Sequence, residues 1–238
     1  MMRKMILAAL SAGAAVGMAG VAQAQDVQTW SLSGTVGTHR VGMQLTIASG
    51  NVYKAGHYFY VSQLKDIVLV GSETGNKLTL MENEGGLFHL TLQGGATFDT
   101  ANALTGAWTE GATTLPVKLS LDSASAGVGG HLYADVTNDS DAVFEARVRK
   151  FLSAVLAGNK AEAASAVAYP LAVNGAHPLS VKTPAQLEAD WSQIFTPGLI
   201  AQLKTAVPHD MFVHNGQAMV AGGAAWFGAK GATTLNQP

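Results

Sequence analysis

Apolar side chains recur at every second position through most of the first half of the chain, between residues 30 and 121. One clear run consists of Val41, Met43, Leu45 and Ile47. A repeat of two is that of a β-strand with one buried face. Short segments rich in Gly, Asn and Ser interrupt the alternation, as hairpin turns do. We therefore expect about seven or eight antiparallel strands, forming a meander or, because closure removes unpaired edges, a β-barrel.

The interior of a small barrel is either packed or open to a ligand. The aromatic residues that could line it are Tyr53, Tyr58, Phe59, Tyr60 and Trp108. Aromatic residues are frequent in strands for packing reasons alone, so a packed interior is the simpler expectation. Residues 104–109, with their Gly-x-Trp, resemble the late strand of small lipocalin-like or avidin-like barrels, and this resemblance implies a similar small barrel here.

The composition changes after position 122. Residues 123–140 are rich in Ser, Ala, Gly and Asn, which bury little surface and are typical of a connection. We therefore place a barrel-like domain at residues 25–122, a linker at 123–140 and a second domain at 141–238. Residues 131–136 could instead be a last strand of the first domain.

The second half shows a helical repeat instead. One stripe of an amphipathic helix consists of Phe144, Val148, Phe151, Leu152 and Val155. An alanine-rich helix at 160–168 and a hairpin around Asn174-Gly175 follow. Thr183-Pro184 and Thr196-Pro197 are helix starts with a capping residue and a first-turn proline. From Met211 onward the pattern returns to strands, which we expect at Met211 to His214, Gln217 to Phe227 and Thr233 to Asn236, with a turn at Asn215-Gly216.

This order of elements resembles the cone of the nuclear transport factor 2-like family, which ketosteroid-isomerase-like proteins share. The motifs that carry the resemblance are Tyr169-Pro170-Leu171, Ile194-Phe195 with Thr196-Pro197, and the segments 215–216, 225–227 and 235–236. The resemblance implies helices packed on a curved antiparallel sheet. The fold class expected for the whole chain is therefore α+β, a β-barrel or meander followed by a cone.

The chain opens with a segment typical of an export signal. Arg3 and Lys4 precede an apolar stretch at residues 5–21, and Ala22-Gln23-Ala24 has the small residues that a signal peptidase prefers. We expect residues 1–24 to be removed, which leaves 238 − 24 = 214 residues and a charge of 12 − 16 = −4. Glycines dilute the apolar stretch, which argues against a membrane span. The expected location is periplasmic or secreted, in soluble form.

Composition excludes several classes of function. A net charge of −2 gives no basic surface for nucleic acid, and the absence of cysteine excludes disulfides, thiolate metal sites and a cysteine nucleophile. The seven histidines are scattered, and the nearest cluster is His209-Asp210 with His214. Because metal sites usually show closer pairs, we expect neither a metal nor a cofactor. No Gly-x-Ser-x-Gly elbow is present, so no catalytic residue is assigned.

The residues singled out for ligand binding are Tyr169, Trp191 and Trp226, of which the two tryptophans are expected to close the wide end of the cone or form its floor. Cone-fold enzymes place an acid or base in an apolar pocket, where burial shifts its pKa. If the cone is catalytic, the candidates for that group are Tyr169, His177, Asp190, Asp210 and His214.

The preferred interpretation is a non-enzymatic exported protein that binds a small apolar ligand or another envelope protein. One alternative is an isomerase or dehydratase acting on a small apolar substrate in the cone. A second is a periplasmic inhibitor or immunity protein that blocks a toxic hydrolase with its loops. The sequence leaves the ligand, the partner and the oligomeric state open.

Overall fold

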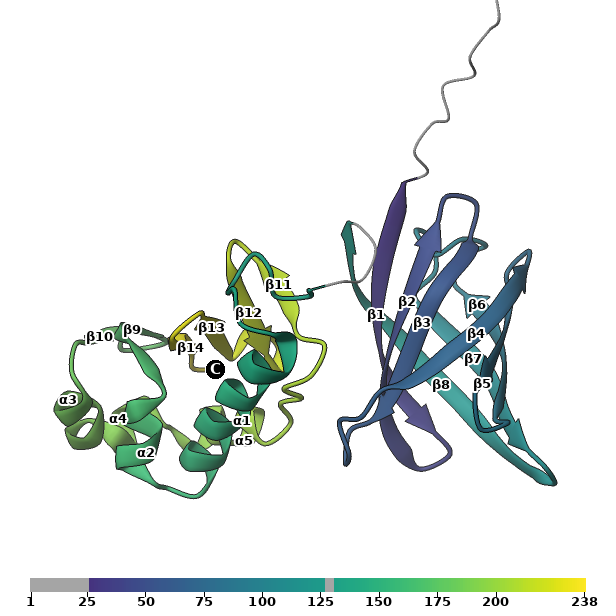
Figure 1. Cartoon of the computed structure of the whole chain (residues 1–238). Helices are drawn as coiled ribbons and strands as arrows, with labels where there is room; N and C mark the ends of the chain where they lie inside the picture. Colours follow the sequence, from purple (N-terminus) through teal and green to yellow (C-terminus); the bar gives the residue numbers. More distant parts are fainter. Residues whose placement is uncertain (1–25, 127–130) are drawn as a thin grey trace, which may run out of the picture.

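The computed structural model of the chain describes residues 26–126 and 131–238 (Figure 1). The expected export signal therefore lies outside the described residues. A β-barrel occupies residues 27–126, and a second sheet with several helices, which we call the α+β unit, occupies residues 131–238. The fold class is α+β, as the sequence predicted.

The barrel is closed, and each strand pairs antiparallel with the next along the chain, while β1 pairs with β8. The sequence-based expectation of a closed barrel of short strands is thus confirmed. The strands are β1 (Val27–Val36), β2 (His39–Ala48), β3 (Val52–Tyr60), β4 (Ile67–Thr74), β5 (Lys77–Glu82), β6 (Leu87–Gln93), β7 (Ala103–Glu110) and β8 (Thr113–Ala126).

The barrel interior is a packed hydrophobic core that also holds one carboxylate. The alternating residues Met43, Leu45 and Leu80 lie at 1% exposure or less. Glu82 is buried among them and accepts hydrogen bonds from the Tyr58 hydroxyl at 2.8 Å and from Trp108 Nε1 at 2.5 Å. Both donors reach the Oε1 atom of Glu82 and offset part of the cost of desolvating this carboxylate.

The outer wall formed by β2 and β3 carries side chains that are buried although they point away from the barrel core. Phe59 is 2% exposed and lies across Gly42, where an added Cβ would sit 2.2 Å from the Phe59 ring. The Phe59 ring meets the His209 ring of the α+β unit edge to face, with centroids 4.4 Å apart. His57 and Phe59 therefore lie on the outer face of β3, which the α+β unit covers. Tyr58, between them in the sequence, faces the barrel core.

Both ends of the segment expected to be a linker, residues 123–140, belong to ordered parts of the fold. Strand β8 continues to Ala126, past the predicted end of the barrel at 122. Residues 132–136 form turns, and not the last strand that the sequence allowed. Tyr133 is fully buried in the core of the α+β unit, because Asp141 holds the preceding turn by accepting from the backbone N–H groups of Leu132 and Tyr133.

The α+β unit has one mixed six-stranded sheet in the order β10-β9-β14-β13-β12-β11, in which only the β14–β9 pair is parallel. Its elements are α1 (Asp141–Leu156), α2 (Lys160–Ser165), β9 (Val167–Asn174), β10 (Leu179–Val181), α3 (Pro184–Ala189), α4 (Trp191–Ile194), α5 (Pro197–Leu203), β11 (Phe212–His214), β12 (Gln217–Val220), η1 (Ala221–Gly223), β13 (Ala225–Gly228) and β14 (Gly231–Asn236). The stripe of α1 packs into a core separate from that of the barrel.

Helices α3 and α5 begin where capping chemistry predicts. Thr183 and Thr196 accept hydrogen bonds from the backbone of Gln186 and Leu199, as capping residues do. Two predictions were wrong in detail. The second helix ends at Ser165, and the following residues join β9 instead. The run from Gln217 to Phe227 is a hairpin of β12 and β13, not one strand.

Among the described residues, no helix has the length and apolar character needed to cross a membrane.

Candidate functional site

A cleft of about 980 Å³ lies between the outer wall of the barrel and the α+β unit. We call it the central cleft. The barrel contributes small polar side chains of β1, β2 and β8, together with His57 and Asp66; the α+β unit contributes the turns before α1, the first turn of that helix, and the segment before β11. The ionisable residues of the lining are His57, Asp66, His131, Asp135, Asp141, Glu145, His209 and Asp210.

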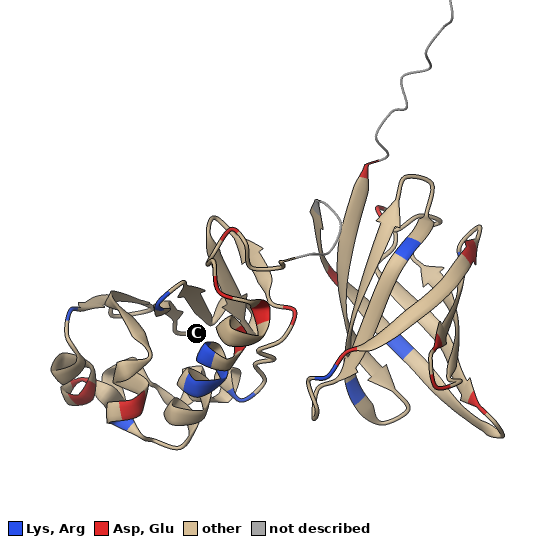
Figure 2. Cartoon of the chain, in the orientation of Figure 1, with Lys and Arg blue, Asp and Glu red and all other residues tan. Residues whose placement is uncertain are grey.

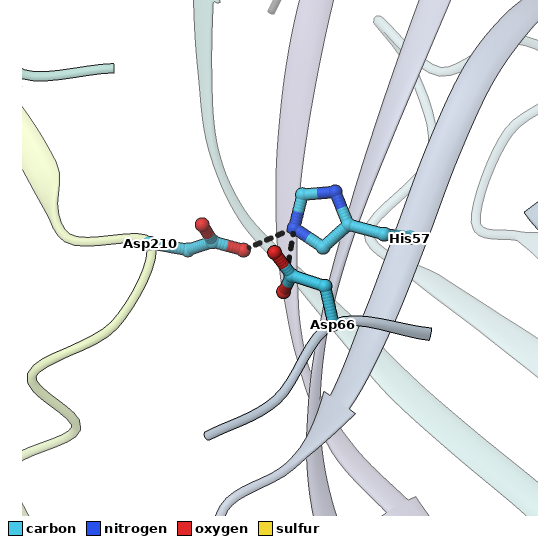
Figure 3. Close-up of side chains that lie close together, drawn as sticks. All are labelled: His57, Asp66 and Asp210. Carbon is cyan, nitrogen blue, oxygen red and sulfur yellow. Dashed lines mark hydrogen bonds and ion pairs between the residues drawn. The ribbon is translucent and has the colours of Figure 1, made fainter. Parts of the chain in front are cut away.

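Three side chains converge at one point of the central cleft (Figure 3). His57 Nε2 lies 2.7 Å from Asp210 Oδ2 and 3.5 Å from Asp66 Oδ1. His57 belongs to the outer face of β3, Asp66 immediately precedes β4, and Asp210 comes from the segment before β11. The group thus joins residues 153 positions apart in the chain.

A second imidazole extends this group. His209 Nε2 lies 2.8 Å from Asp66 Oδ1, and His209 Nδ1 lies 2.7 Å from Glu145 Oε2. Both ring nitrogens face carboxylate oxygens, so both donate when the ring is protonated. His57, Asp66, Glu145, His209 and Asp210 are called the cleft cluster below. Its imidazoles and carboxylates alternate across the contact between barrel and α+β unit.

Glu145 anchors the cluster to the α+β unit. It sits in the second turn of α1, is 5% exposed, and accepts at Oε1 from the Tyr133 hydroxyl at 2.9 Å and from the backbone N–H of Asp210 at 3.3 Å. The Tyr133 oxygen in turn accepts from the backbone N–H of Met211 at 3.0 Å. Arg149 approaches Glu145 Oε2 at 3.7 Å. The segment before β11 is therefore held by α1 through hydrogen bonds to one carboxylate.

The backbone of Asp210 has a left-handed conformation, with a φ of 49°. Asp tolerates this region better than most residues because its short polar side chain can bond locally. The conformation directs the Asp210 carboxylate toward the barrel while its N–H points back to Glu145.

The cluster shifts the pKa values of its members in opposite directions. Burial lowers the pKa of His57, but the hydrogen bond to Asp210 and the charges of Asp210 and Asp66 outweigh burial and raise it. Burial likewise opposes the protonated form of His209, yet its hydrogen bonds to Asp66 and Glu145 raise its pKa to about 10. The pKa of Asp66 is lowered, chiefly by the hydrogen bond from His209. The cluster therefore favours imidazolium–carboxylate pairs.

The same atoms could hold a metal ion. In two overlapping sets, one donor atom from each residue lies within 4.8 Å of the others: His57 with Asp66 and Asp210, and Glu145 with His209 and Asp210. Imidazole nitrogen and carboxylate oxygen are both ligands of divalent transition metals. The sequence-based expectation of no metal had treated His209-Asp210 and His214 as the nearest cluster. His214 is exposed on β11 and does not belong to the cleft cluster.

The residues predicted to bind a ligand lie elsewhere, in the α+β unit. The Tyr169 hydroxyl donates to the Ala164 carbonyl at 3.0 Å. Trp191 is half-buried, packs against Phe195 with ring centroids 4.3 Å apart, and has Lys160 Nζ above its ring at 5.9 Å. Trp226 lines a separate hollow of about 330 Å³. The structure does not bring these three residues into one described pocket.

Sequence reasoning named Asp210 as a possible acid or base and His209-Asp210 as part of the nearest histidine cluster, but it did not connect them with His57, Asp66 and Glu145. No sequence pattern distinguishes Asp66, because an aspartate after a surface turn is common. Glu145 does carry one, because it lies seven positions before Leu152 and thus on the same side of α1 as the buried stripe. A charged residue beside a buried stripe is informative, as such residues are rarely buried without a partner.

Comparisons with protein-family models, with curated proteins and with solved structures found no match to this chain.

Proposed function

We propose that this protein is an exported binding protein that holds a cationic ligand in the central cleft. One observation carries the proposal: the lining residues that the structure describes include five carboxylates and three histidines, but neither lysine nor arginine. Even with His57 and His209 protonated, the five carboxylates outnumber the positive charges of the described lining. A cleft with an excess of one sign of charge and low-dielectric walls concentrates ions of the opposite sign.

The size and polarity of the cleft narrow the ligand class. A volume of about 980 Å³ is large enough for a small organic molecule or a hydrated ion. Figure 2 shows several acidic positions on the side of the α+β unit that faces the barrel. On the barrel side, Thr29, Gln44 and Thr46 are buried polar residues of the wall. This lining favours a polar cation over the small apolar ligand that the sequence suggested.

The contact between the barrel and the α+β unit is suited to opening. Its described contacts include imidazole–carboxylate pairs and the Phe59–His209 ring contact, whereas each half has its own apolar core. Polar contacts between domains commonly permit relative motion. A ligand that bridges the two walls would favour the closed arrangement, since it adds attraction between them.

Two finer features belong to the same proposal. The helix–helix–hairpin–helix–strand order of the α+β unit and its parallel β9–β14 pair support a nuclear transport factor 2-like cone. Export in soluble form to the periplasm or medium rests on Arg3, Lys4 and Ala22-Gln23-Ala24. N-terminal sequencing of protein from the native host tests export: a chain starting at Gln25 supports it, and retained Met1 contradicts it.

The cation proposal is tested by thermal unfolding of the full chain with spermidine, an organic polycation. We expect spermidine to raise the denaturation midpoint, and Asp66→Asn to reduce that rise by removing a carboxylate from the cleft lining. The matched control is Asp99→Asn, an exposed aspartate between β6 and β7 that does not line the cleft, which should respond like the wild type.

Two outcomes would contradict the proposal. One is that neither spermidine nor a divalent cation raises the midpoint. The other is that Asp66→Asn and Asp99→Asn respond equally to both kinds of cation, because the effect would then come from net charge and not from the cleft.

A second candidate function is acid–base catalysis in the same cleft. The observation that favours it is that His57 and His209 each lie within hydrogen-bonding distance of a carboxylate beside open volume, an arrangement that orients an imidazole for proton transfer. The isomerase or dehydratase predicted from the sequence would then act at the cleft and not in the apolar interior of the cone.

A further inference from the structure

The three convergent side chains His57, Asp66 and Asp210 offer one nitrogen and two oxygens from both walls of the central cleft. Their donor atoms lie within 4.8 Å of one another. Donors bound to a metal at about 2.0 to 2.2 Å lie about 3 to 3.6 Å apart around a tetrahedral ion. Small side-chain rotations would therefore bring all three donors into contact with one ion.

The charge of this group favours a cation even when its histidine is protonated. Two carboxylates face one imidazole at 2.7 and 3.5 Å, so the group keeps an excess negative charge. His209 shares Asp66 but is also paired with Glu145. A divalent ion in place of the His57 proton would neutralise the remaining negative charge more fully.

His209 and Glu145 form hydrogen bonds with two of the three proposed metal ligands, and these bonds fix the positions of the ligands. His209 Nε2 donates to Asp66 and fixes its carboxylate, while Glu145 accepts from His209 Nδ1 and from the Asp210 backbone. Hydrogen-bonded partners of this kind orient the side chains that bind a metal and tune their affinity for the ion. Glu145 already accepts hydrogen bonds at both of its oxygens, so we assign it to this supporting role.

We propose that His57, Asp66 and Asp210 form a divalent transition-metal site that bridges the barrel and the α+β unit, with the remaining coordination positions open to the central cleft. This inference rests on the proposed cation-binding function and names the cation. The mixed nitrogen and oxygen donors favour an ion such as Zn²⁺ over Mg²⁺ or Ca²⁺, which prefer oxygen ligands alone. Three protein ligands with an open position are typical of sites where the ion also contacts a bound molecule.

The test is isothermal titration of the full chain, freed of metal by chelation, with ZnCl₂ and separately with MgCl₂. We expect one Zn²⁺ per chain and much weaker binding of Mg²⁺. His57→Gln and Asp210→Asn should each weaken Zn²⁺ binding at least about tenfold, as loss of one of three ligands removes a direct metal bond. His177→Gln and Asp99→Asn, both exposed and outside the cleft, are the matched controls and should bind like the wild type.

A further variant separates ligation from a merely structural role. His57→Asp keeps a ligand but exchanges nitrogen for oxygen, so we expect the preference for Zn²⁺ over Mn²⁺ to decrease, since carboxylates suit Mn²⁺. Circular dichroism of every variant checks that the fold is retained. If His57→Gln does not fold, the metal affinities of the His57→Asp and Asp210→Asn variants still test whether these side chains bind the ion.

The outcomes also separate this inference from the proposed function. If spermidine stabilises the wild type through Asp66 while Zn²⁺ does not bind, the proposal of a cation-binding cleft is supported and the metal site is rejected. If Zn²⁺ binds equally well to the wild type and to Asp210→Asn, the ion lies elsewhere and the assignment is overturned. If neither cation has an effect, both proposals fail.

Discussion

Glu145 is the residue on which the geometry of the cleft cluster depends most. Its two oxygens receive the Tyr133 hydroxyl, the Asp210 backbone N–H and His209 Nδ1 within 3.3 Å. A buried carboxylate is tolerated only when such partners compensate its desolvation. The side chain therefore fixes both the segment before β11 and the orientation of the His209 ring.

Glu145→Gln should destabilise the α+β unit by about 1 to 3 kcal/mol, because the new amide would present N–H donors to a protonated His209 nitrogen or to the Tyr133 hydroxyl. Urea denaturation measures the change. Glu84→Gln, in the exposed turn between β5 and β6, is the control and should change stability by about 0.5 kcal/mol or less. Equal losses in the two variants would show that Glu145 is not a buried anchor.

Tyr53 allows a prediction about pH. Burial raises the pKa of Tyr53 to about 12, and its hydroxyl donates to the Leu69 carbonyl at 2.7 Å. Since the pKa is higher in the folded chain than the ordinary value of 10.0, the neutral hydroxyl stabilises the fold below pH 10, and this contribution is lost as the pH rises through about 12.

The measurement compares urea denaturation of the wild type and Tyr53→Phe at several pH values. At pH 8 the wild type should be more stable by about 1 kcal/mol, the typical net value of one hydrogen bond. The difference should shrink as the pH rises above 10, because only the wild type loses a proton at this position. A difference that stays constant up to pH 12 would contradict the assignment.

At the scale of elements, the β2–β3 wall connects barrel packing to the cleft. Phe59 occupies the space above Gly42 and supports the His209 ring. Gly42→Ala should displace Phe59 and cost about 1 to 3 kcal/mol, the usual range for overpacking. In a Phe59→Ala background the same change should cost almost nothing, because the ring it meets is gone. An unchanged cost in that background would place the strain elsewhere.

The elements were predictable to the extent that local pattern determines them. Alternation indicated the barrel, and Thr183 and Thr196 marked helix starts. The β12–β13 hairpin was missed because its connection, Ala221–Gly223, consists of small residues that do not interrupt the apolar run. All three have positive φ angles, Ala221 as well as the two glycines. His57 and Phe59 alternate like core residues, and only the position of the α+β unit shows that they face outward from the barrel.

The cleft cluster could not be predicted in the same way. Asp66 and Asp210 are far apart in the chain and meet only because the α+β unit sits against one wall of the barrel. Sequence spacing reveals metal or catalytic sets when the ligands share a helix or a hairpin. A set divided between two folded halves has no characteristic spacing. The members with a local indication were the adjacent pair His209-Asp210 and Glu145 beside its buried stripe.

For the whole molecule, the separate hydrophobic cores predict two unfolding transitions. Leu80 is fully buried in the barrel core, and Trp191 is half-buried against the core of the α+β unit. Leu80→Ala should destabilise the barrel by about 2 to 5 kcal/mol. Trp191→Ala should destabilise the α+β unit by about 1 to 3 kcal/mol, less than for a fully buried tryptophan, because part of the ring is already exposed.

Calorimetry of the full chain checks this prediction. Each substitution should lower one transition and leave the other within error, because each half has its own apolar core and the described contacts between the halves are a few imidazole–carboxylate pairs and the Phe59–His209 ring contact. Limited proteolysis should then cut first between residues 123 and 140 and release two stable fragments. One cooperative transition lowered by both substitutions, with cuts spread evenly along the chain, would mean that the cleft cluster couples the halves into a single folding unit.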